Sequence, residues 1–299
     1  MLTPRPHNPS LAALLTLLAA GLAAGTTLLA KALGTGMLGD YVLGPSMHAL
    51  QISHGRFLFA FLTIGLATLT LRPRLVRPAL GLHVTRSALG FGGVTLMFAA
   101  AAFIPLSDAT AISFLNPVFG MMLAIPLLGE RVGPVRWGAA GIALVGAAIL
   151  TRPGADTLQL GALLALGAAV LLGAELIAIK KLSGREAPIQ VLLVNNMIGL
   201  CIATVVVIAV WQAPTASQWA ALAGIGVLMA GAQACFVNAM ARADASYVAP
   251  FFYAALVFAA FYDFMFFGVR PDLISVAGGA IILSGAGLLA WRQARLRAA

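Results

Sequence analysis

Five charged side chains interrupt long apolar stretches of the sequence, where each could bind a charged ligand, pair with an opposite charge or exchange a proton. They are Lys31, Arg56, Arg86, Glu175 and Asp263. A charge at the centre of a hydrocarbon layer costs at least roughly 2.5–3.5 kcal/mol on insertion scales, so each of them needs a partner or a task. Counting about 1.5 Å of helix per residue places Glu175 and Arg86 in the inner half of the membrane. The same count places Lys31, Arg56 and Asp263 in the outer half.

These depths predict two ion pairs around a polar path between helices. We expect Glu175 to pair with Arg86, and Asp263 to pair with either Arg56 or Lys31. The alternative for Lys31 and Arg86 is that their long side chains extend to the membrane surface. Glu175 is too short to do so, and a desolvated carboxyl group at its position could bind and release a proton.

Three uncharged polar side chains are weaker candidates for ligand binding. Gln233 lies near the middle of an apolar run, Asn116 precedes a proline, and Tyr262 lies among aromatic residues that could stack on a flat or cationic ligand. Hydrogen bonds between helices explain many such amides, at an average of about 0.6 kcal/mol. An aromatic ring in an apolar helix also commonly faces lipid.

Residues that bend the backbone accompany these side chains. Pro117 lies near the middle of the apolar run 107–128, where a proline removes a helical hydrogen bond and bends the helix. In lipid the freed carbonyl must find a partner or line a cavity. Gly90, Gly92 and Gly93 either permit bending or let another helix pack closely. We expect a kink at Pro117 and a hinge at the three glycines.

The composition decides which elements hold these residues. Of 299 residues, 61% are hydrophobic and 9% are charged, whereas soluble domains carry about 25% charged residues. This composition predicts a polytopic membrane protein in contact with a lipid bilayer. The net charge of +9 comes mostly from loops, and no basic stretch is interleaved with aromatic residues, so no nucleic-acid partner is expected. Cys201 and Cys235 lie in apolar runs and are interpreted as small hydrophobic side chains.

Ten apolar segments approach the roughly 20 residues that a helix needs to cross the hydrocarbon. The connections between them are short, so no soluble domain is inserted. The first segment is long for the hydrophobic part of a signal peptide, which favours a retained helix. The expected segments are 10–33, 47–71, 80–104, 107–128, 135–151, 158–181, 189–211, 217–240, 245–268 and 273–291.

Lysine and arginine residues predict the orientation of these helices. If the N-terminus is cytoplasmic and ten helices alternate, thirteen of these residues lie at cytoplasmic ends and two, Arg152 and Arg270, lie in outer loops. The asymmetry follows the positive-inside rule. We therefore expect a multi-pass protein of the cytoplasmic (inner) membrane with both termini in the cytoplasm.

The second half of the sequence repeats the first. Residues 129–150 align with 268–289, and the string SDAT at 107–110 aligns with ADAS at 243–246. With five helices in each half, the second half is inverted in the membrane, an arrangement typical of secondary transporters. We therefore expect an all-α membrane protein of ten transmembrane helices. They form two inverted five-helix repeats, residues 1–152 and 153–299, around a central cavity.

One long string carries a family resemblance. FAAAAFIPLSDATAISFLNPVFGMMLAIPLLGERV, followed by RWGAAGIALVGAAILTRPG, resembles the EamA repeat of the drug/metabolite transporter superfamily. The likeness is close from about Arg86 to Gly154 and weaker in the second half, where Val269 replaces the usual Glu. It implies ten helices around a central cavity, alternating access, and substrates that range over amino acids, amines, vitamins, S-adenosylmethionine, metallophores and drugs. Within the family, the string is similar to a branch with S-adenosylmethionine and riboflavin carriers and an opine-metallophore exporter.

The sequence favours a secondary-active transporter of a small polar or amphipathic metabolite. We do not expect the protein to be an enzyme. The alternatives are a passive channel or facilitator, whose usual ring of one charge type is not evident, and a drug exporter. A lipid enzyme would need a cluster of acids with a histidine, which is also not evident. No P-loop motif occurs and no histidine has a second ligand at metal spacing, so neither metal nor cofactor is expected. A proton is the candidate coupling ion, and the protein is expected to be a monomer or a homodimer.

Overall fold

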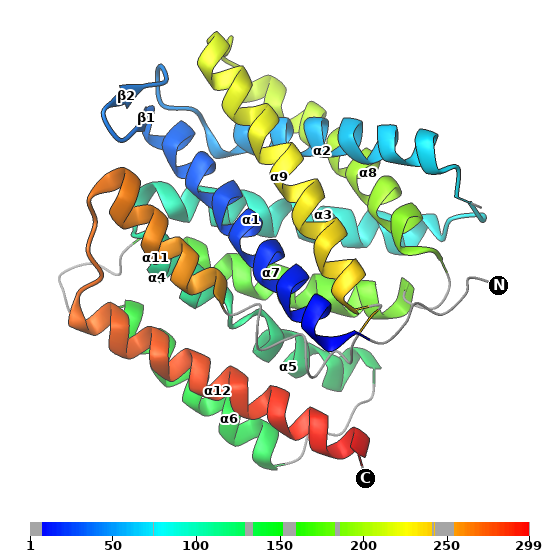
Figure 1. Cartoon of the computed structure of the whole chain (residues 1–299), viewed down its shortest axis with the longest axis vertical. Helices are drawn as coiled ribbons and strands as arrows, with labels where there is room; N and C mark the ends of the chain where they lie inside the picture. The colour runs from blue at the N-terminus through cyan, green and yellow to red at the C-terminus, as the bar shows by residue number, and fades with distance from the viewer. Residues whose placement is uncertain are drawn as a thin grey trace.

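The structure is a computed structural model that describes residues 8–73, 75–128, 134–151, 160–182, 186–240, 242 and 254–298. In this part of the chain, helices form a bundle and short β1 and β2 pair as an antiparallel hairpin (Figure 1). In chain order the elements are α1 (Pro9–Thr35), β1 (Met37–Leu38), β2 (Tyr41–Val42), α2 (Ala49–Leu71), α3 (Leu80–Phe103), α4 (Leu106–Ser113), α5 (Asn116–Leu128), α6 (Pro134–Thr151), α7 (Leu160–Leu182), α8 (Pro188–Val207), η1 (Ile208–Val210), α9 (Ala216–Met240), α11 (Ala254–Phe267) and α12 (Leu273–Ala298).

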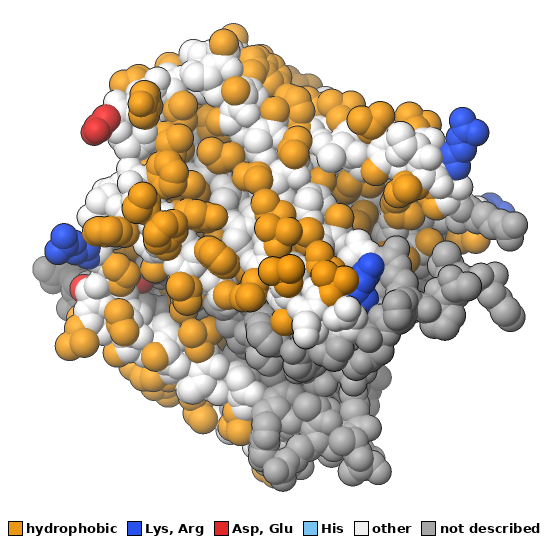
Figure 2. Space-filling view, in the orientation of Figure 1, with side chains coloured by type: hydrophobic (Ala, Val, Ile, Leu, Met, Phe, Trp, Pro, Cys, Tyr) orange, Lys and Arg blue, Asp and Glu red, His pale blue; other side chains and the backbone are white. Residues whose placement is uncertain are grey.

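The described helices suit a lipid environment. Seven described spans are long and apolar enough to cross a membrane, one of which, Asp108–Leu127, runs across α4 and α5, and two further apolar stretches, Ala254–Phe267 and Leu273–Gly285, are shorter. Hydrophobic side chains spread over the face in Figure 2, and most of the few charged ones lie towards its edges. On α2, for example, Leu66 and Leu69 are 65% and 74% exposed. Soluble monomers rarely expose large continuous apolar surfaces, so the bundle is a multi-pass membrane protein.

The helical run 107–128 is interrupted at the two residues before Asn116 and Pro117. α4 ends at Ser113 and α5 begins at Asn116, so Pro117 is the second residue of α5. A proline at the start of a helix costs no hydrogen bond, because the first N–H groups have no partner inside the helix. The N–H groups of Phe114 and Leu115 donate back to carbonyls of α4. The run 107–128 is therefore two helices joined by a two-residue turn next to Pro117, and the bend of this segment towards the cavity stays a prediction.

Helices from the two halves of the sequence pack against each other, and they do so symmetrically. α1 packs on α9, α2 on α8 and α9, α3 on α7 and α8, and α6 on α12. If the two matched ranges are paired helix for helix in chain order, α1, α2 and α3 correspond to α7, α8 and α9. When each helix is replaced by its counterpart in the other half, the α1–α9 contact corresponds to the α7–α3 contact. In the same way, the α2–α9 contact corresponds to the α8–α3 contact. The α1–α11 contact likewise corresponds to α7–α5, and all of these contacts occur.

The buried core surrounds α3. One apolar cluster joins α3 to α4, α7, α11 and α12, and a second joins α3 to α1, α2 and α9. From α3, Ala100 belongs to the first cluster and Phe98 to the second. α3 therefore lies between the two halves of the packing, where its side chains can reach residues of both.

Two of the predicted hinge glycines let α3 approach α7 closely. A Cβ added at Gly92 would lie 2.9 Å from the Cδ1 atom of Leu171, and one at Gly93 would lie 2.8 Å from the side chain of Leu172. Real Cβ atoms essentially never show contacts this short, so a larger residue at either position would force the side chain of Leu171 or Leu172 to move. Close packing is thus the role that the structure gives these glycines, and the hinge stays a prediction.

Candidate functional site

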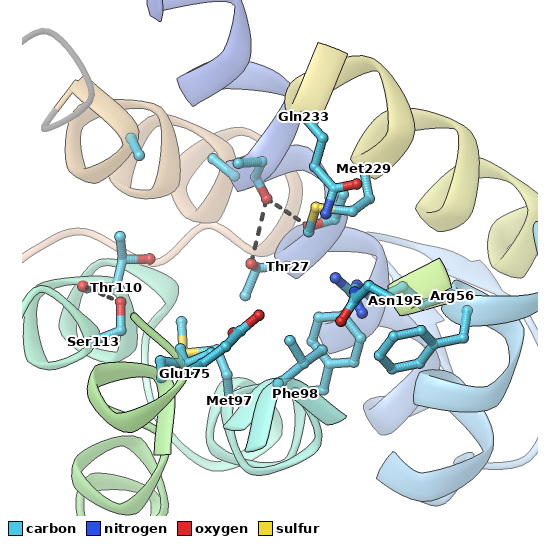
Figure 3. A pocket seen from close by; sticks show the side chains of 18 of the residues that line it. Thr27, Arg56, Met97, Phe98, Thr110, Ser113, Glu175, Asn195, Met229 and Gln233 are labelled. Carbon is cyan, nitrogen blue, oxygen red and sulfur yellow. Dashed lines mark hydrogen bonds between the residues drawn. The ribbon is translucent and has the colours of Figure 1, made fainter. Parts of the chain in front are cut away.

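A cavity of about 260 Å³ lies where α1, α2, α3, α4, α7, α8, α9 and α11 converge (Figure 3). Ligand sites for drug-sized molecules typically enclose about 300–1,000 Å³, so this cavity must widen to accept one. Its apolar lining includes Phe57, Met97, Phe98, Phe114 and Met229, and its charged and amide lining consists of Arg56, Arg86, Glu175, Asn195 and Gln233. A concave apolar site with a few polar groups is the usual form of a small-molecule site.

Glu175 and Arg86 form the ion pair predicted from the sequence. The Nε atom of Arg86 lies 3.3 Å from Oε1 of Glu175, and the side chains are 7% and 15% exposed. The Nη1 group of Arg86 donates to the carbonyl of Val191 on α8 at 3.2 Å. The pair thus joins α3, α7 and α8 at the wall of the cavity.

Gly90 makes room for the carboxylate of this pair. A Cβ at Gly90 would lie 3.1 Å from the carboxylate carbon and both oxygens of Glu175. The absence of a side chain therefore lets the carboxylate lie directly against the backbone of α3. Gly90 also lines the cavity. Room for the carboxylate of Glu175 is therefore a second reason for a glycine at this position, besides the predicted hinge.

Arg56 lacks the partner that was predicted for it. Asp263 pairs with Lys31, so the alternative pairing with Arg56 is wrong. The side chain of Arg56 is buried, and its Nε and Nη1 atoms have no hydrogen-bond partner among the described residues. Its guanidinium group lies 4.5 Å from the ring centre of Phe57. In Figure 3 Arg56 and Glu175 reach into the cavity from opposite sides.

Lys31 and Asp263 form a separate buried pair outside the cavity lining. The Nζ atom of Lys31 lies 2.6 Å from Oδ1 of Asp263 and 4.6 Å from the ring centre of Phe267. The other carboxylate oxygen accepts a hydrogen bond from the backbone N–H of Leu106, the first residue of α4. This group, called the Asp263 cluster here, joins α1, α4 and α11.

A second polar cluster, not predicted from the sequence, lies at the other end of α3. Glu186 accepts hydrogen bonds from the backbone N–H of Ala79 at 2.8 Å and from Gln190 at 2.7 Å, and its Oε2 lies 2.9 Å from Nε2 of His83. The amide of Gln190 also exchanges two hydrogen bonds with the backbone of Val76. This Glu186 cluster ties the segment before α3 to the start of α8.

Hydrogen bonding changes the acidity of Glu186. Burial acts to raise the pKa of this carboxyl group, but the hydrogen bonds from Ala79, His83 and Gln190, together with the charge of His83, lower it below its ordinary value. The two clusters flank the cavity, because His83 lies in the first turn of α3 and Leu106 follows its end. Helix geometry separates them by roughly 30 Å.

The remaining predicted residues divide between the cavity and the helix contacts. Gln233 lines the cavity, and its Oε1 atom has no hydrogen-bond partner among the described residues. Tyr262 does not line it; its hydroxyl group donates to the carbonyl of Gly21 at 3.4 Å. Asn116 is half-buried at the start of α5 and also lies outside the lining.

The cavity contains residues for which the sequence offered little signal. Thr110 and Ser113 line it from α4, and polar side chains within two turns of the predicted proline bend could have been singled out. Asn195 lines it from α8 and accepts a hydrogen bond from Ser87 at 3.1 Å. Glu186 had no local signal, because its partners on and before α3 are more than 100 positions away in the sequence. Within the described ranges, no group of three or more His, Cys, Asp or Glu side chains could hold a metal ion.

Several known proteins that this chain resembles in sequence are transporters. A sequence model of the EamA-like transporter family matches residues 10–152 and 159–291. A riboflavin transporter of Rhizobium johnstonii is 36% identical, over 68% of this chain and 67% of the relative. A riboflavin transporter of Vibrio cholerae serotype O1 is 32% identical, over 78% of this chain and 79% of the relative. An S-adenosylmethionine uptake transporter of Rickettsia bellii is 27% identical, over 81% and 83%.

The fold also has a counterpart among solved structures. One crystal structure superposes with a TM-score of 0.66 at 20% sequence identity, and the match covers 96% of this chain and 99% of the other. At this identity the likeness concerns the fold alone. It extends over nearly the whole bundle, so the helices around the cavity belong to one shared architecture.

Proposed function

The chain belongs to the EamA-like transporter family and is a metabolite transporter of the drug/metabolite superfamily, and we propose that its substrate binds in the central cavity. The observation that carries this proposal is the convergence of helices from both halves on one cavity with three charged residues, Arg56, Arg86 and Glu175. Transporters with repeated halves bind their substrates between the repeats, near the middle of the membrane. Transport would then be secondary-active and proceed by alternating access.

The proposal includes the topology of the chain. It has ten transmembrane helices in two inverted repeats, residues 1–152 and 153–299, and both termini are on the cytoplasmic side of the inner membrane. The symmetric exchange of helix contacts between the halves supports the repeat, as do the two matched ranges. The distribution of Lys and Arg supports the orientation.

Cysteine labelling tests this orientation. Tyr41 in the hairpin after α1 is 79% exposed, and Leu75 between α2 and α3 is 52% exposed. With Cys201 and Cys235 replaced by Ala, Tyr41→Cys should react with a membrane-impermeant maleimide on intact cells. Leu75→Cys should react only after permeabilisation, because a single helix separates the two positions. Labelling of both from the same side would contradict the proposed topology.

Riboflavin is the substrate that we propose first. Two relatives at 32% and 36% identity are named riboflavin transporters. The aromatic rings of Phe57, Phe98 and Phe114 offer apolar walls for a flat ring system, and Arg56 and Gln233 offer hydrogen-bonding groups for its polar edge. S-adenosylmethionine, named for a relative at 27% identity, is the second candidate.

Counterflow in proteoliposomes is the direct test of this function. Vesicles loaded with unlabelled riboflavin should take up labelled riboflavin from outside and accumulate it transiently above equilibrium. A passive channel cannot exchange one molecule for another and should show no such overshoot. S-adenosylmethionine is run in parallel. If the reconstituted protein exchanges neither compound, the proposal for both substrates is refuted.

Alternating access requires parts that open at each end of the cavity, and we assign these parts to the two polar clusters. The Asp263 cluster joins α1 to α4 and α11, and the Glu186 cluster joins the segment before α3 to α8. Each connects the two halves of the chain. Breaking the hydrogen bonds of one cluster while the other stays closed would open the cavity to one side only.

Glu186→Gln is expected to weaken the Glu186 cluster in a pH-dependent way. The lowered pKa means that the ionised carboxylate stabilises the folded protein above the ordinary value of 4.5, and that this contribution is lost as the pH falls through the lowered pKa. The variant should therefore melt below the wild type at pH 7, and the difference should shrink on acidification. Thermal melting between pH 7 and pH 3 measures this. Asp40→Asn, at an exposed carboxylate in the hairpin, is the control; an equal loss in both variants would count against the cluster.

A further inference from the structure

Arg56 is the one cation of the described cavity lining that has no carboxylate of its own. The other lining cation, Arg86, lies 3.3 Å from Glu175 and also donates to a backbone carbonyl. Arg56 is 5% exposed, yet its Nε and Nη1 atoms have no hydrogen-bond partner in the described part of the chain. Its side chain points into the cavity (Figure 3). Buried polar groups are almost always hydrogen-bonded, and an exception calls for an explanation.

The charges of the cavity also favour a ligand with oxygen acceptors. Its described ionisable residues are Arg56, Arg86 and Glu175, which leaves one positive charge in excess. The ring of Phe57 at 4.5 Å provides a cation–π contact, but that contact does not satisfy the N–H groups. A guanidinium group has five N–H donors in a fixed plane and binds carboxylate and carbonyl oxygens well.

We propose that Arg56 binds the oxygen-acceptor group of the transported substrate, a carboxylate or a pair of ring carbonyls, and thereby sets the substrate class. This inference rests on the proposed function, because it takes the ligand in the cavity to be the transported substrate. Gln233 lies on α9, and its Oε1 atom, which has no hydrogen-bond partner among the described residues, accepts a hydrogen bond from a donor group of the substrate. The substrate therefore has an apolar body beside Phe57 and Phe98, an acceptor edge towards Arg56 and an N–H or O–H group towards Gln233.

The stability of the ligand-free protein distinguishes a binding group from a structural one. An unpaired buried charge destabilises the fold, and groups kept for function are often replaced with a gain in stability. Arg56→Met should therefore melt at the same temperature as the wild type or a few degrees higher. Arg86→Met is the matched control and should melt lower, because it leaves Glu175 without its ion pair. If Arg56→Met melts as low as Arg86→Met, Arg56 is structural and the proposal is overturned.

Ligand binding to the full-length protein in nanodiscs tests the same residue directly. The probes are riboflavin, which has ring carbonyls, S-adenosylmethionine, which has a carboxylate, and decarboxylated S-adenosylmethionine. Arg56→Met should weaken binding of the preferred probe at least about tenfold, which corresponds to roughly 1.4 kcal/mol, and Arg56→Lys should recover part of the loss. Preference for riboflavin identifies carbonyls as the acceptor; preference for S-adenosylmethionine over its decarboxylated form identifies a carboxylate.

Failure of this inference can be separated from failure of the proposed function. Unchanged affinity and exchange in Arg56→Met would overturn the inference, while wild-type counterflow would still support a transporter of that substrate. If the wild type binds and exchanges none of the probes, the proposed substrates fail. The ligand-free melting order of Arg56→Met and Arg86→Met then decides the inference by itself.

Discussion

Asp263→Ala is expected to destabilise the protein by about 3–5 kcal/mol, the typical cost of removing one partner of a buried ion pair. Asp263 is 1% exposed and Lys31 is 8% exposed, with 2.6 Å between the charged atoms. The substitution leaves the ammonium group of Lys31 without its anion and the N–H of Leu106 without its acceptor. Thermal or denaturant unfolding of the protein in detergent measures the loss.

A double variant separates the unpaired charge from the lost contacts. Lys31→Met with Asp263→Leu removes both charges, and replacing a buried pair by apolar residues is often neutral or stabilising. The double variant should therefore recover most of the stability that Asp263→Ala loses. A loss of less than about 1 kcal/mol in Asp263→Ala would show that water reaches Lys31 and that the pair is not buried in the working protein.

Transport by the same double variant tests the role of the Asp263 cluster as a gate. The cluster links α4 to α1 and α11 through charge and one hydrogen bond to the backbone. A folded double variant that exchanges substrate at the wild-type rate, with no leak of the substrate down its gradient, would show that this pair contributes stability and no gating.

Glu175→Gln is expected to reduce accumulation of the substrate by at least about tenfold, since it removes the anion that Arg86 contacts at the cavity wall. Two physical roles predict different remaining activities. If Glu175 carries the coupling proton, the variant should lose proton-driven accumulation and keep substrate exchange. If Glu175 stays charged as a gate or as the counter-ion of a substrate cation, exchange itself should fall. Uptake driven by a pH gradient and counterflow without a gradient, in the same proteoliposomes, distinguish the two.

The control for Glu175→Gln is Gly90→Ala, which keeps the carboxylate but adds a Cβ 3.1 Å from it. The carboxylate must then move by a few tenths of an ångström from the backbone of α3. If its position matters, Gly90→Ala should slow exchange while proton-driven accumulation, where present, persists at a lower rate. Accumulation at the wild-type level by Glu175→Gln would reject both roles and leave Glu175 as a structural hydrogen-bonding group.

The sequence alone was sufficient for the class of this protein, a helical membrane protein built from two related halves. An apolar composition, ten long apolar segments and a repeated motif predict a helical membrane bundle, because crossing hydrocarbon requires helices of a set length. Within the described residues, the predicted segments fall on helices, except that 107–128 is divided into α4 and α5. The pairing of Glu175 with Arg86 also followed from depth alone, since few side chains of opposite charge lie at the same level.

Among the described residues, the tertiary structure decided which buried charges meet and left Arg56 without a carboxylate partner. Lys31 and Arg56 were equal candidates for Asp263, because depth along a helix does not determine which face points at a neighbour. The packing of α1 on α11 places Lys31 against Asp263, and that of α2 leaves Arg56 in the cavity. The Glu186 cluster was beyond sequence reasoning for the same reason: its hydrogen bonds join segments that only the packing of α3 with α8 brings together.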